Sequence, residues 1–234
     1  MKLLVFLLLL LPSLALAQPT VTTVTPITGT GATSCGASID ATGTNTGMLA
    51  AIALASSAPV STVTDASYNS VPMTFVVART DSQDAARIEY WYLHAPTTGS
   101  NSFVANFSDL VDFACEVYVL ENTRQTGAVG NTSVDAQTSS STSLNLASAA
   151  TELVFDAVVG EGSGGDCTPG GSQAERYDDD SPSLHCGSTL VGSASTTLTQ
   201  TLNNGPWFWA AAAVAIKQPA AAAATIRRKP ILIQ

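Results

Sequence analysis

The feature that most limits how this chain can fold is an alternation of apolar and polar residues with a period of two. Runs of this kind recur between turn residues, and no segment from 18 to 218 shows the 3.6-residue spacing of an amphipathic helix. Because side chains alternate across a β-strand, the runs predict half-buried strands of antiparallel sheets. The predicted strands are residues 21–26, 34–41, 47–56, 71–80, 87–95, 101–107, 111–120, 141–147, 151–160, 195–202 and 206–218.

Two of the clearest runs carry acidic residues opposite their apolar face. In the run 111–120, Glu116 points away from the apolar residues, and in the run 151–160 Asp156 does the same. We therefore predict that each strand buries one face and leaves the other to solvent, as in an antiparallel sandwich.

The absence of helical segments that could cover a parallel sheet predicts an all-β fold of two packed antiparallel sheets, jelly-roll-like in topology. The composition is 45% hydrophobic and 12% charged, which is too apolar for a disordered chain. The length fits one large β-domain or two small ones. We predict one β-sandwich domain, residues 18–218.

The first 17 residues predict an export signal. Lys2 forms the positive end, an apolar run follows, and Ala15-Leu16-Ala17 forms a small-x-small cleavage site. The apolar run is too short for a membrane span, although an uncleaved anchor is the alternative. We expect a mature chain that begins near Gln18, is secreted or held at the cell surface, and is not inserted in a membrane.

The formal net charge of −9 limits the partners. An acidic surface repels phosphate groups, so we expect no nucleic acid and no anionic membrane surface as a partner.

The four cysteines predict two disulfides, because export permits them. Cys167 and Cys186 flank a Gly- and Asp-rich segment that we expect to be a long loop, and a bridge between them would staple it. Cys35 and Cys115 then pair, and the neighbouring residues place both on core faces. The alternative for this second pair is two buried free thiols, and neither pair has the spacing of a zinc site.

Several segments, in order, resemble a family of secreted bacterial and phage-associated β-sandwich surface domains. They are VSTVTDASYNSVPMTFVV (60–77), ARIEYWYLHAPTTGSNSFVANFS (86–108), SAATELVFDAVVG (148–160), a Gly-x-Gln-x-x-Arg-aromatic segment in GGSQAERYDDDS, and WFWAAAAVAIKQ (207–218). The resemblance covers residues 34–218 and implies a jelly-roll-like sandwich, with no catalytic residues to transfer. The four cysteines and the long acidic loop depart from the family's usual pattern.

No catalytic residue is predicted. The two histidines, His94 and His185, lie away from any Gly-x-Ser-x-Gly elbow. A pair of carboxylates for glycoside hydrolysis could come from any two strands, but no pattern marks one.

The candidate ligand-binding residues are aromatic. Trp207 and Trp209 lie opposite the core face of the last strand, and Tyr90 and Tyr92 share one face of theirs. Sugars stack on flat aromatic rings, so these side chains are candidates for carbohydrate binding. The alternative is that the rings pack inside the sandwich, which the doubly apolar strand 86–96 favours.

The acidic loop 161–186 holds the candidate metal site. Its acidic residues suit calcium, which takes six to eight oxygen ligands, although the spacing is not that of an EF-hand. The alternative is a solvated acidic loop, and no other cofactor is expected. The candidate ligands are Glu161, Asp166, Asp178, Asp179 and Asp180.

Residues 219–234 predict a tail outside the domain. Arg227, Arg228 and Lys229 form a basic triplet, and the following ILIQ is a short apolar segment that could add to a sheet edge. Docking on its own domain would tether the tail, and docking on a neighbouring subunit would cause self-association. The alternative is a frayed terminus.

Together these patterns predict a secreted, non-catalytic β-sandwich that acts in surface attachment or carbohydrate binding. Its expected partners are glycans or another surface protein. The alternatives are a structural subunit of an extracellular filament or virion, and a carbohydrate-processing enzyme.

Overall fold

The computed structural model describes residues 17–56, 59–161, 165–181, 183–203 and 207–220. All but the last residue of the predicted signal peptide, and residues 221–234 of the predicted tail, lie outside these ranges. Among the described residues the regular structure is all β, and no helix is present that is long and apolar enough to cross a membrane. The all-β prediction is confirmed.

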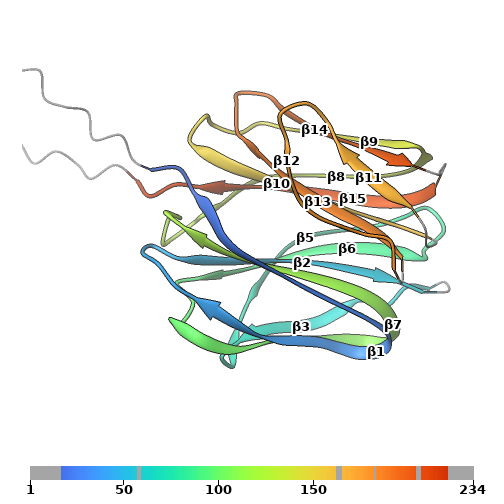
Figure 1. The fold of residues 1–234 in the computed structure, drawn as a ribbon, viewed down its shortest axis with the longest axis horizontal. Coiled ribbons are helices and arrows are strands. Elements are labelled where there is room, and N and C mark those ends of the chain that lie inside the picture. Colours follow the sequence, from blue (N-terminus) through green and yellow to red (C-terminus); the bar gives the residue numbers. More distant parts are fainter. Residues whose placement is uncertain (1–16, 57–58, 162–164, 182, 204–206, 221–234) are drawn as a thin grey trace, which may run out of the picture.

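The first half of the chain forms one antiparallel sheet of seven strands. Its strands are β1 (Thr20–Ala41), β2 (Gly47–Ala55), β3 (Val63–Tyr68), β4 (Val71–Pro72), β5 (Thr74–Thr80), β6 (Ala86–His94) and β7 (Gly99–Glu121). The long strands β1 and β7 pair along their whole length, with register irregularities between Gly29 and Ser34. The sheet folds over on itself, so that β3 and the nearby parts of β1 and β7 form an outer layer over β2 and β6 (Figure 1).

The second half forms two further antiparallel sheets, one of five strands and one of three. Its strands are β8 (Val129–Ser139), β9 (Ser141–Leu146), β10 (Glu152–Gly160), β11 (Asp166–Pro169), β12 (Ala174–Asp179), β13 (Leu184–Val191), β14 (Thr196–Asn203) and β15 (Trp207–Lys217). The five-stranded sheet has the order β12-β13-β10-β15-β8, and the three-stranded sheet has the order β11-β14-β9.

The two halves have the same topology. The inner layer of the first half runs β5-β6-β2-β7-β1, which corresponds strand for strand to β12-β13-β10-β15-β8. The outer layer of the first half runs β3-β7-β1, which corresponds to β11-β14-β9. The 18–218 domain therefore consists of two successive sandwiches, each with an inner and an outer layer, and the predicted two-sheet sandwich occurs twice.

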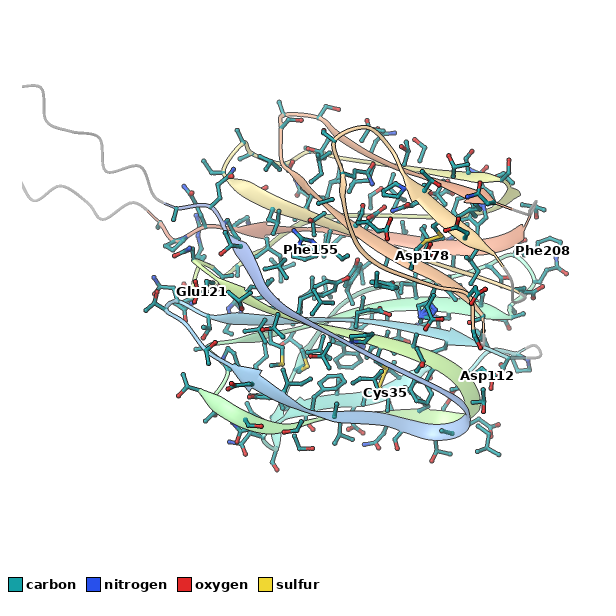
Figure 2. The ribbon with its side chains drawn as sticks, in the orientation of Figure 1. Cys35, Asp112, Glu121, Phe155, Asp178 and Phe208 are labelled. Atoms are coloured by element: carbon teal, nitrogen blue, oxygen red, sulfur yellow. A yellow bond between two sulfur atoms is a disulfide. The ribbon has the colours of Figure 1, made fainter. Side chains whose placement is uncertain are left out.

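The two sandwiches pack with their inner layers face to face. Figure 1 shows four stacked layers, from β1, β3 and β7 on one side to β9 and β14 on the other. One hydrophobic core lies inside each sandwich, and a third core lies between the inner layers, where Phe155 is seen in Figure 2. Each inner layer is thus covered on both faces.

Both predicted disulfides are confirmed, and each one joins the inner and outer layers of one sandwich. Cys35 of β1 is bonded to Cys115 of β7, with 6.9 Å between their Cα atoms. Cys167 of β11 is bonded to Cys186 of β13, with 6.2 Å between their Cα atoms. Among the described residues, no disulfide joins one sandwich to the other.

The prediction that strands bury only one face is wrong for the inner layers. Every residue of β2 is buried, and so are Glu116 of β7 and Asp156 of β10. The other sandwich packs on the Glu116 face of β7, whereas the outer layer of the C-terminal sandwich covers the Asp156 face of β10. The alanines of β15 at positions 210–213 allow the close approach, since small side chains let two sheets pack on both faces of one strand.

The Gly- and Asp-rich segment between the second pair of cysteines is not one long loop. It contains β11, β12 and the start of β13, and β12 pairs with β13 along the edge of the five-stranded sheet. Its composition obscured the strands because few of its side chains are apolar, and an edge strand needs little apolar surface.

Candidate functional site

The structure places the predicted aromatic ligand residues mainly in the core. Tyr90, Tyr92 and Trp209 are 0%, 1% and 1% exposed, and the Trp209 indole N–H donates a 3.1 Å hydrogen bond to Ser139 Oγ. Their interpretation as surface stacking rings is therefore wrong, because β6 and β15 are inner strands covered on both faces. Trp207 begins β15, and its side chain lies outside the described part of the chain.

On one flank, the interface between the sandwiches is closed by a buried polar group of side chains. Glu116 of β7 faces His185 of β13, with 3.4 Å between Oε1 and Nε2, and both side chains are buried. Tyr177 of β12 packs edge-on against the His185 ring, with 5.5 Å between ring centroids. We call Glu116, His185, Tyr90, Tyr118 and Tyr177 the interlayer cluster.

A glycine makes room for this cluster. A Cβ atom at Gly187 would lie 2.4 Å from Cε1 of Tyr177, so the tyrosine ring lies over β13 only because position 187 has no side chain. Burial raises the pKa of the Glu116 carboxyl, and the nearby tyrosine hydroxyl opposes that rise only in part.

Burial disfavours the charged forms of the side chains in the interlayer cluster. It raises the pKa of Glu116 well above its ordinary value and lowers the pKa of His185 to about 3. Burial likewise raises the pKa values of the Tyr90, Tyr118 and Tyr177 hydroxyls. The environment thus favours an uncharged carboxyl beside an uncharged imidazole.

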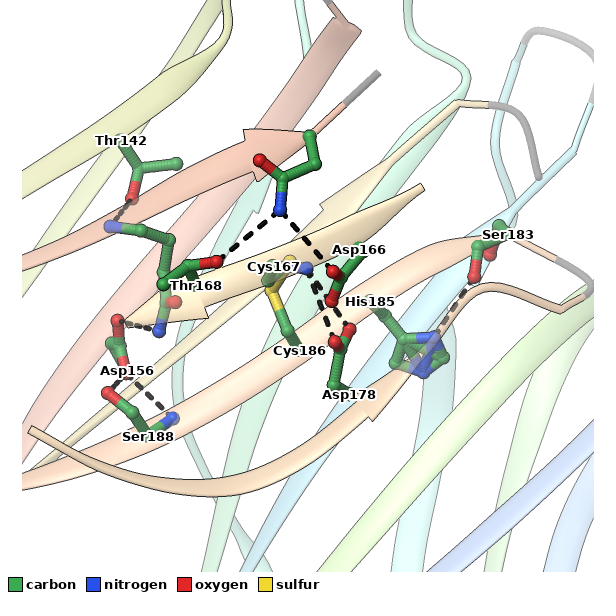
Figure 3. The surroundings of a disulfide bond; sticks show 12 residues. Thr142, Asp156, Asp166, Cys167, Thr168, Asp178, Ser183, His185, Cys186 and Ser188 are labelled. Carbon is green, nitrogen blue, oxygen red and sulfur yellow. Dashed lines mark hydrogen bonds between the residues drawn. A yellow bond between two sulfur atoms is a disulfide. The ribbon is translucent and has the colours of Figure 1, made fainter. Parts of the chain in front are cut away.

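A second buried acid lies inside the C-terminal sandwich. Asp156 accepts hydrogen bonds from the backbone N–H and hydroxyl of Ser188 and a 3.0 Å bond from the Gln200 amide (Figure 3). Burial still raises the pKa of Asp156 to about 6, although these donors act in the opposite direction. The residue joins β10 to β13 and β14, which is a structural role.

On the opposite flank, the interface between the sandwiches is open. The free edges of β5 and β8 lie side by side there and border a groove of about 360 Å³. We call it the edge groove. It is lined by Thr74, Phe75, Val76, Tyr92, His94, Gly127, Val129, Gly130 and Thr132.

Two β-bulges shape the edge groove. In β5 the residue Val76 is extra relative to β6, because Phe75 pairs with Trp91 and Val77 pairs with Tyr90. In β8 there are two residues, 130 and 131, opposite the single residue Ala215 of β15. Bulges bend edge strands and re-aim side chains, and they occur preferentially beside binding and active sites.

The two faces of β5 and β6 differ beside the edge groove. The ring of Phe75 is 49% exposed and packs edge-on against Trp91, with 5.5 Å between ring centroids, on the opposite face of the sheet from Tyr92 and His94. The His94 ring packs edge-on against Tyr92, and no hydrogen-bond partner of its buried Nδ1 atom is present among the described residues. Tyr92, one of the predicted ligand residues, thus lines the edge groove, where its ring packs against the ring of His94.

Four of the five predicted metal ligands do come together. Asp166, Asp178, Asp179 and Asp180 line one hollow beside the second disulfide, and Glu161 lies elsewhere, where Asp81 helps to raise its pKa. Figure 3 shows Asp166 and Asp178 facing each other. In the described ranges, no group of three or more His, Cys, Asp or Glu side chains is arranged to hold a metal ion.

The two facing carboxyls shift each other's pKa in opposite directions. Burial and the hydrogen bond with Asp166 raise the pKa of Asp178 to about 7, whereas that bond lowers the pKa of Asp166. The backbone N–H of Cys167 donates to both Asp178 oxygens at 3.3 Å. A hydrogen-bonded pair is closer than the roughly 5 Å that separates the carboxyls of a retaining glycosidase, so this pair does not have glycosidase geometry.

Calcium binding by this pair stays a prediction, and melting experiments test it. At pH 8 in EDTA, Asp178→Asn should melt at a higher temperature than the native protein, because the amide removes the repulsion between two carboxylates. Calcium should raise the melting temperature of the native protein by mass action and leave that of Asp178→Asn unchanged. A native melting temperature that does not respond to calcium contradicts the calcium prediction.

Comparisons of the chain with protein-family models, with curated proteins and with solved structures found no match. The candidate site therefore rests on its own geometry.

Sequence reasoning missed Phe75 and His94. Phe75 stands in a strand that reads as core, and only the bulge at Val76 and the edge position of β5 leave its ring exposed. His94 was considered only as a catalytic base, and it ends a strand that is mostly buried. No local signal marked the meeting of β5 with β8, which are almost fifty residues apart in the chain.

Proposed function

We propose that this protein is a secreted, non-catalytic β-sandwich that attaches to a surface, with the edge groove as its binding site. The observation that carries the proposal is the contrast between the two flanks. The interlayer cluster fills one junction between the sandwiches, and two bulges hold the other junction open.

Two further observations support an extracellular role. Each sandwich is cross-linked by its own disulfide, and such bonds persist in oxidising compartments. The N-terminal export signal predicted from the sequence agrees with that environment.

A groove-blocking variant tests the proposal. Thr132→Trp places a large ring in the edge groove from an exposed position of β8, so it should abolish retention of the purified protein on fixed cells or insoluble polysaccharide. Leu110→Trp is the matched control, because Leu110 is 62% exposed on β7 and does not line the groove. Equal retention of both variants and the native protein would show that the groove is not the attachment site.

A structural subunit of a filament is the second candidate, and the sheet edges favour it. Each flank presents two stacked edge strands, β5 with β8 and β1 with β12, whose outer backbone groups are open to another strand. Pairing of one flank with the other flank of a second copy would not close on itself and would produce a polymer. Negative-stain microscopy and light scattering of the purified protein at rising concentration distinguish this candidate from a monomeric attachment module.

A further inference from the structure

We propose that a second hollow, at Arg176 of β12, binds a small organic carboxylate with an apolar body. The hollow has a volume of about 280 Å³ and is lined by Leu153, Ser172, Ala174, Arg176, Thr189, Leu190 and Val191. We call it the arginine hollow. It shares no lining residue with the edge groove, so this site is separate from the proposed attachment site.

The arginine hollow is the counterpart of the edge groove in the C-terminal sandwich. In β5 a bulge leaves Val76 extra relative to β6, and in β12, which corresponds to β5, a bulge leaves Arg176 extra relative to β13. The bulge of β8 likewise recurs in β1, where Thr22 is extra relative to β7. The two sandwiches thus repeat the same backbone irregularities, and the hollow has an arginine where the groove has a valine.

The arginine hollow lies on the same flank as the interlayer cluster but at the other end of the strands. Tyr177 and His185 close that flank where the end of β12 meets the start of β13. The hollow lies at residues 174–176 of β12 and 189–191 of β13, which pair at their opposite ends. The flank is therefore filled at one end and hollowed at the other.

The main wall side chains project from one face of the sheet. Leu153 belongs to the core between the inner layers, and Val191 lies directly opposite it on β13. Thr189 lies two residues before Val191 and shares its face, and Ala174 of β12 lies opposite Thr189. Nε of Arg176 donates a 2.8 Å hydrogen bond to the Thr189 hydroxyl, which holds the guanidinium on that same face. One ligand can therefore contact all five side chains.

Arg176 has donors to spare for a ligand. Thr189 engages only Nε, and within the described part of the chain neither terminal nitrogen of the guanidinium has a hydrogen bond or an ion pair. The two terminal N–H groups of a guanidinium match the two oxygens of a carboxylate. Since the bond to Thr189 already orients the side chain, binding costs little additional side-chain entropy.

The remainder of the lining decides what the carboxylate is attached to. Of the described residues that line the hollow, Arg176 alone is charged, so the site offsets one negative charge. Phosphate carries more charge and needs a cluster of donors. Leu153 and Val191 form apolar walls, and Val191 is 51% exposed. An aliphatic body on the ligand would cover these side chains and remove their surface from water.

NMR chemical-shift titrations of the mature protein with butyrate, acetate, butyramide and inorganic phosphate test the proposal. Butyrate should bind more tightly than acetate, because only butyrate has a body that covers the apolar walls. Butyramide and phosphate should bind much more weakly than butyrate. The shifts should centre on the backbone amides of Arg176, Thr189 and Val191.

Variants assign the binding to the arginine hollow. Arg176→Gln should raise the Kd of butyrate about tenfold or more, because it removes the charged hydrogen bonds. Arg79→Gln is the matched control, because Arg79 is an exposed residue of β5 that does not line the hollow. Val191→Ser should weaken butyrate binding more than acetate binding. Melting temperatures verify that each variant is folded.

Three results overturn the proposal. Failure of butyrate and acetate to bind, or an unchanged Kd of butyrate in Arg176→Gln, would show that the hollow is not a carboxylate site. Phosphate binding as tight as that of butyrate would show that the site takes anions in general. Equal affinities for acetate and butyrate would show that the apolar walls do not contact the ligand.

Discussion

Replacing Cys35 and Cys115 together with alanine is expected to lower the free energy of unfolding by about 4.5 kcal/mol. The bridge closes a sequence separation of 80 residues, and the entropy that it removes from the unfolded chain grows with loop length. The shorter bridge from Cys167 to Cys186 closes 19 residues and should contribute roughly 3 kcal/mol. Each bridge also joins two layers of one sandwich through its core, so its loss loosens that sandwich first.

Guanidinium unfolding of the two double variants, followed by tryptophan fluorescence and far-UV circular dichroism, measures these losses. The two single-bridge variants are matched controls for each other, because each retains one sandwich with its bridge. Losses below about 1 kcal/mol in both variants would contradict the entropic argument. A larger loss for the shorter bridge would show that strain or unfolded-state structure outweighs loop length.

The stability of the protein should be greatest in mildly acidic solution and should fall on both sides. The alkaline loss comes from Glu116, whose buried side chain keeps its proton in the folded state. Burial raises the pKa of Glu116 in the folded state. Its contribution to the free energy of unfolding is therefore complete below about pH 4.5 and is lost as the pH rises. Each further pH unit costs about 1.4 kcal/mol while the folded protein holds a proton that the unfolded chain has released.

His185 causes the loss on the acidic side. Burial lowers its folded pKa to about 3, so its contribution is complete above the unfolded value of 6.5 and is lost as the pH falls towards 3. Between pH 4.5 and 6.5 the Glu116 and His185 effects on stability oppose each other, because burial favours the protonated form of one group and the deprotonated form of the other. Asp156 shifts the pH of greatest stability towards the acidic end of the range from 4.5 to 6.5. Burial raises its pKa to about 6, so its contribution to the free energy of unfolding is lost between about pH 4 and 6.

Urea unfolding at fixed pH values from 3 to 9 measures this profile. Glu116→Gln is the informative variant, because a glutamine can keep hydrogen bonds in the cluster without titrating. Above about pH 4.5 its stability should fall less steeply with rising pH than that of the native protein, because only the native side chain exchanges a proton on unfolding. Equal slopes for the two proteins would show that burial does not raise the pKa of Glu116.

The aromatic run at 90–92 illustrates where local sequence reasoning succeeds. Its two apolar faces favoured a covered strand over an open platform, and β6 is such a strand. The same reasoning placed Trp209 on a polar face, where it was expected to be available for a ligand. The structure buries it, because the outer layer of the C-terminal sandwich covers that face of β15.

The fold class and the disulfide pairing could be predicted because they follow from contacts that are local or covalent. The period of two determined the all-β class, since alternation of side chains is a property of a single strand. The parity of Cys35 and Cys115 with their apolar neighbours, together with the flanking positions of Cys167 and Cys186, determined both disulfides.

The layer that covers the second face of each strand could not be predicted, because it comes from segments distant in the chain. The same topology occurs in both sandwiches, and it consists of strand pairing between distant segments. It therefore cannot be predicted from the residues of any single strand. Their face-to-face packing buries Glu116 with His185 on one flank, and on the other flank it brings the bulged edges of β5 and β8 together as the edge groove. A polar face is buried where a second layer extends over it, and a groove stays open where that layer ends. Packing between segments that are distant in the chain sets how far the layer extends.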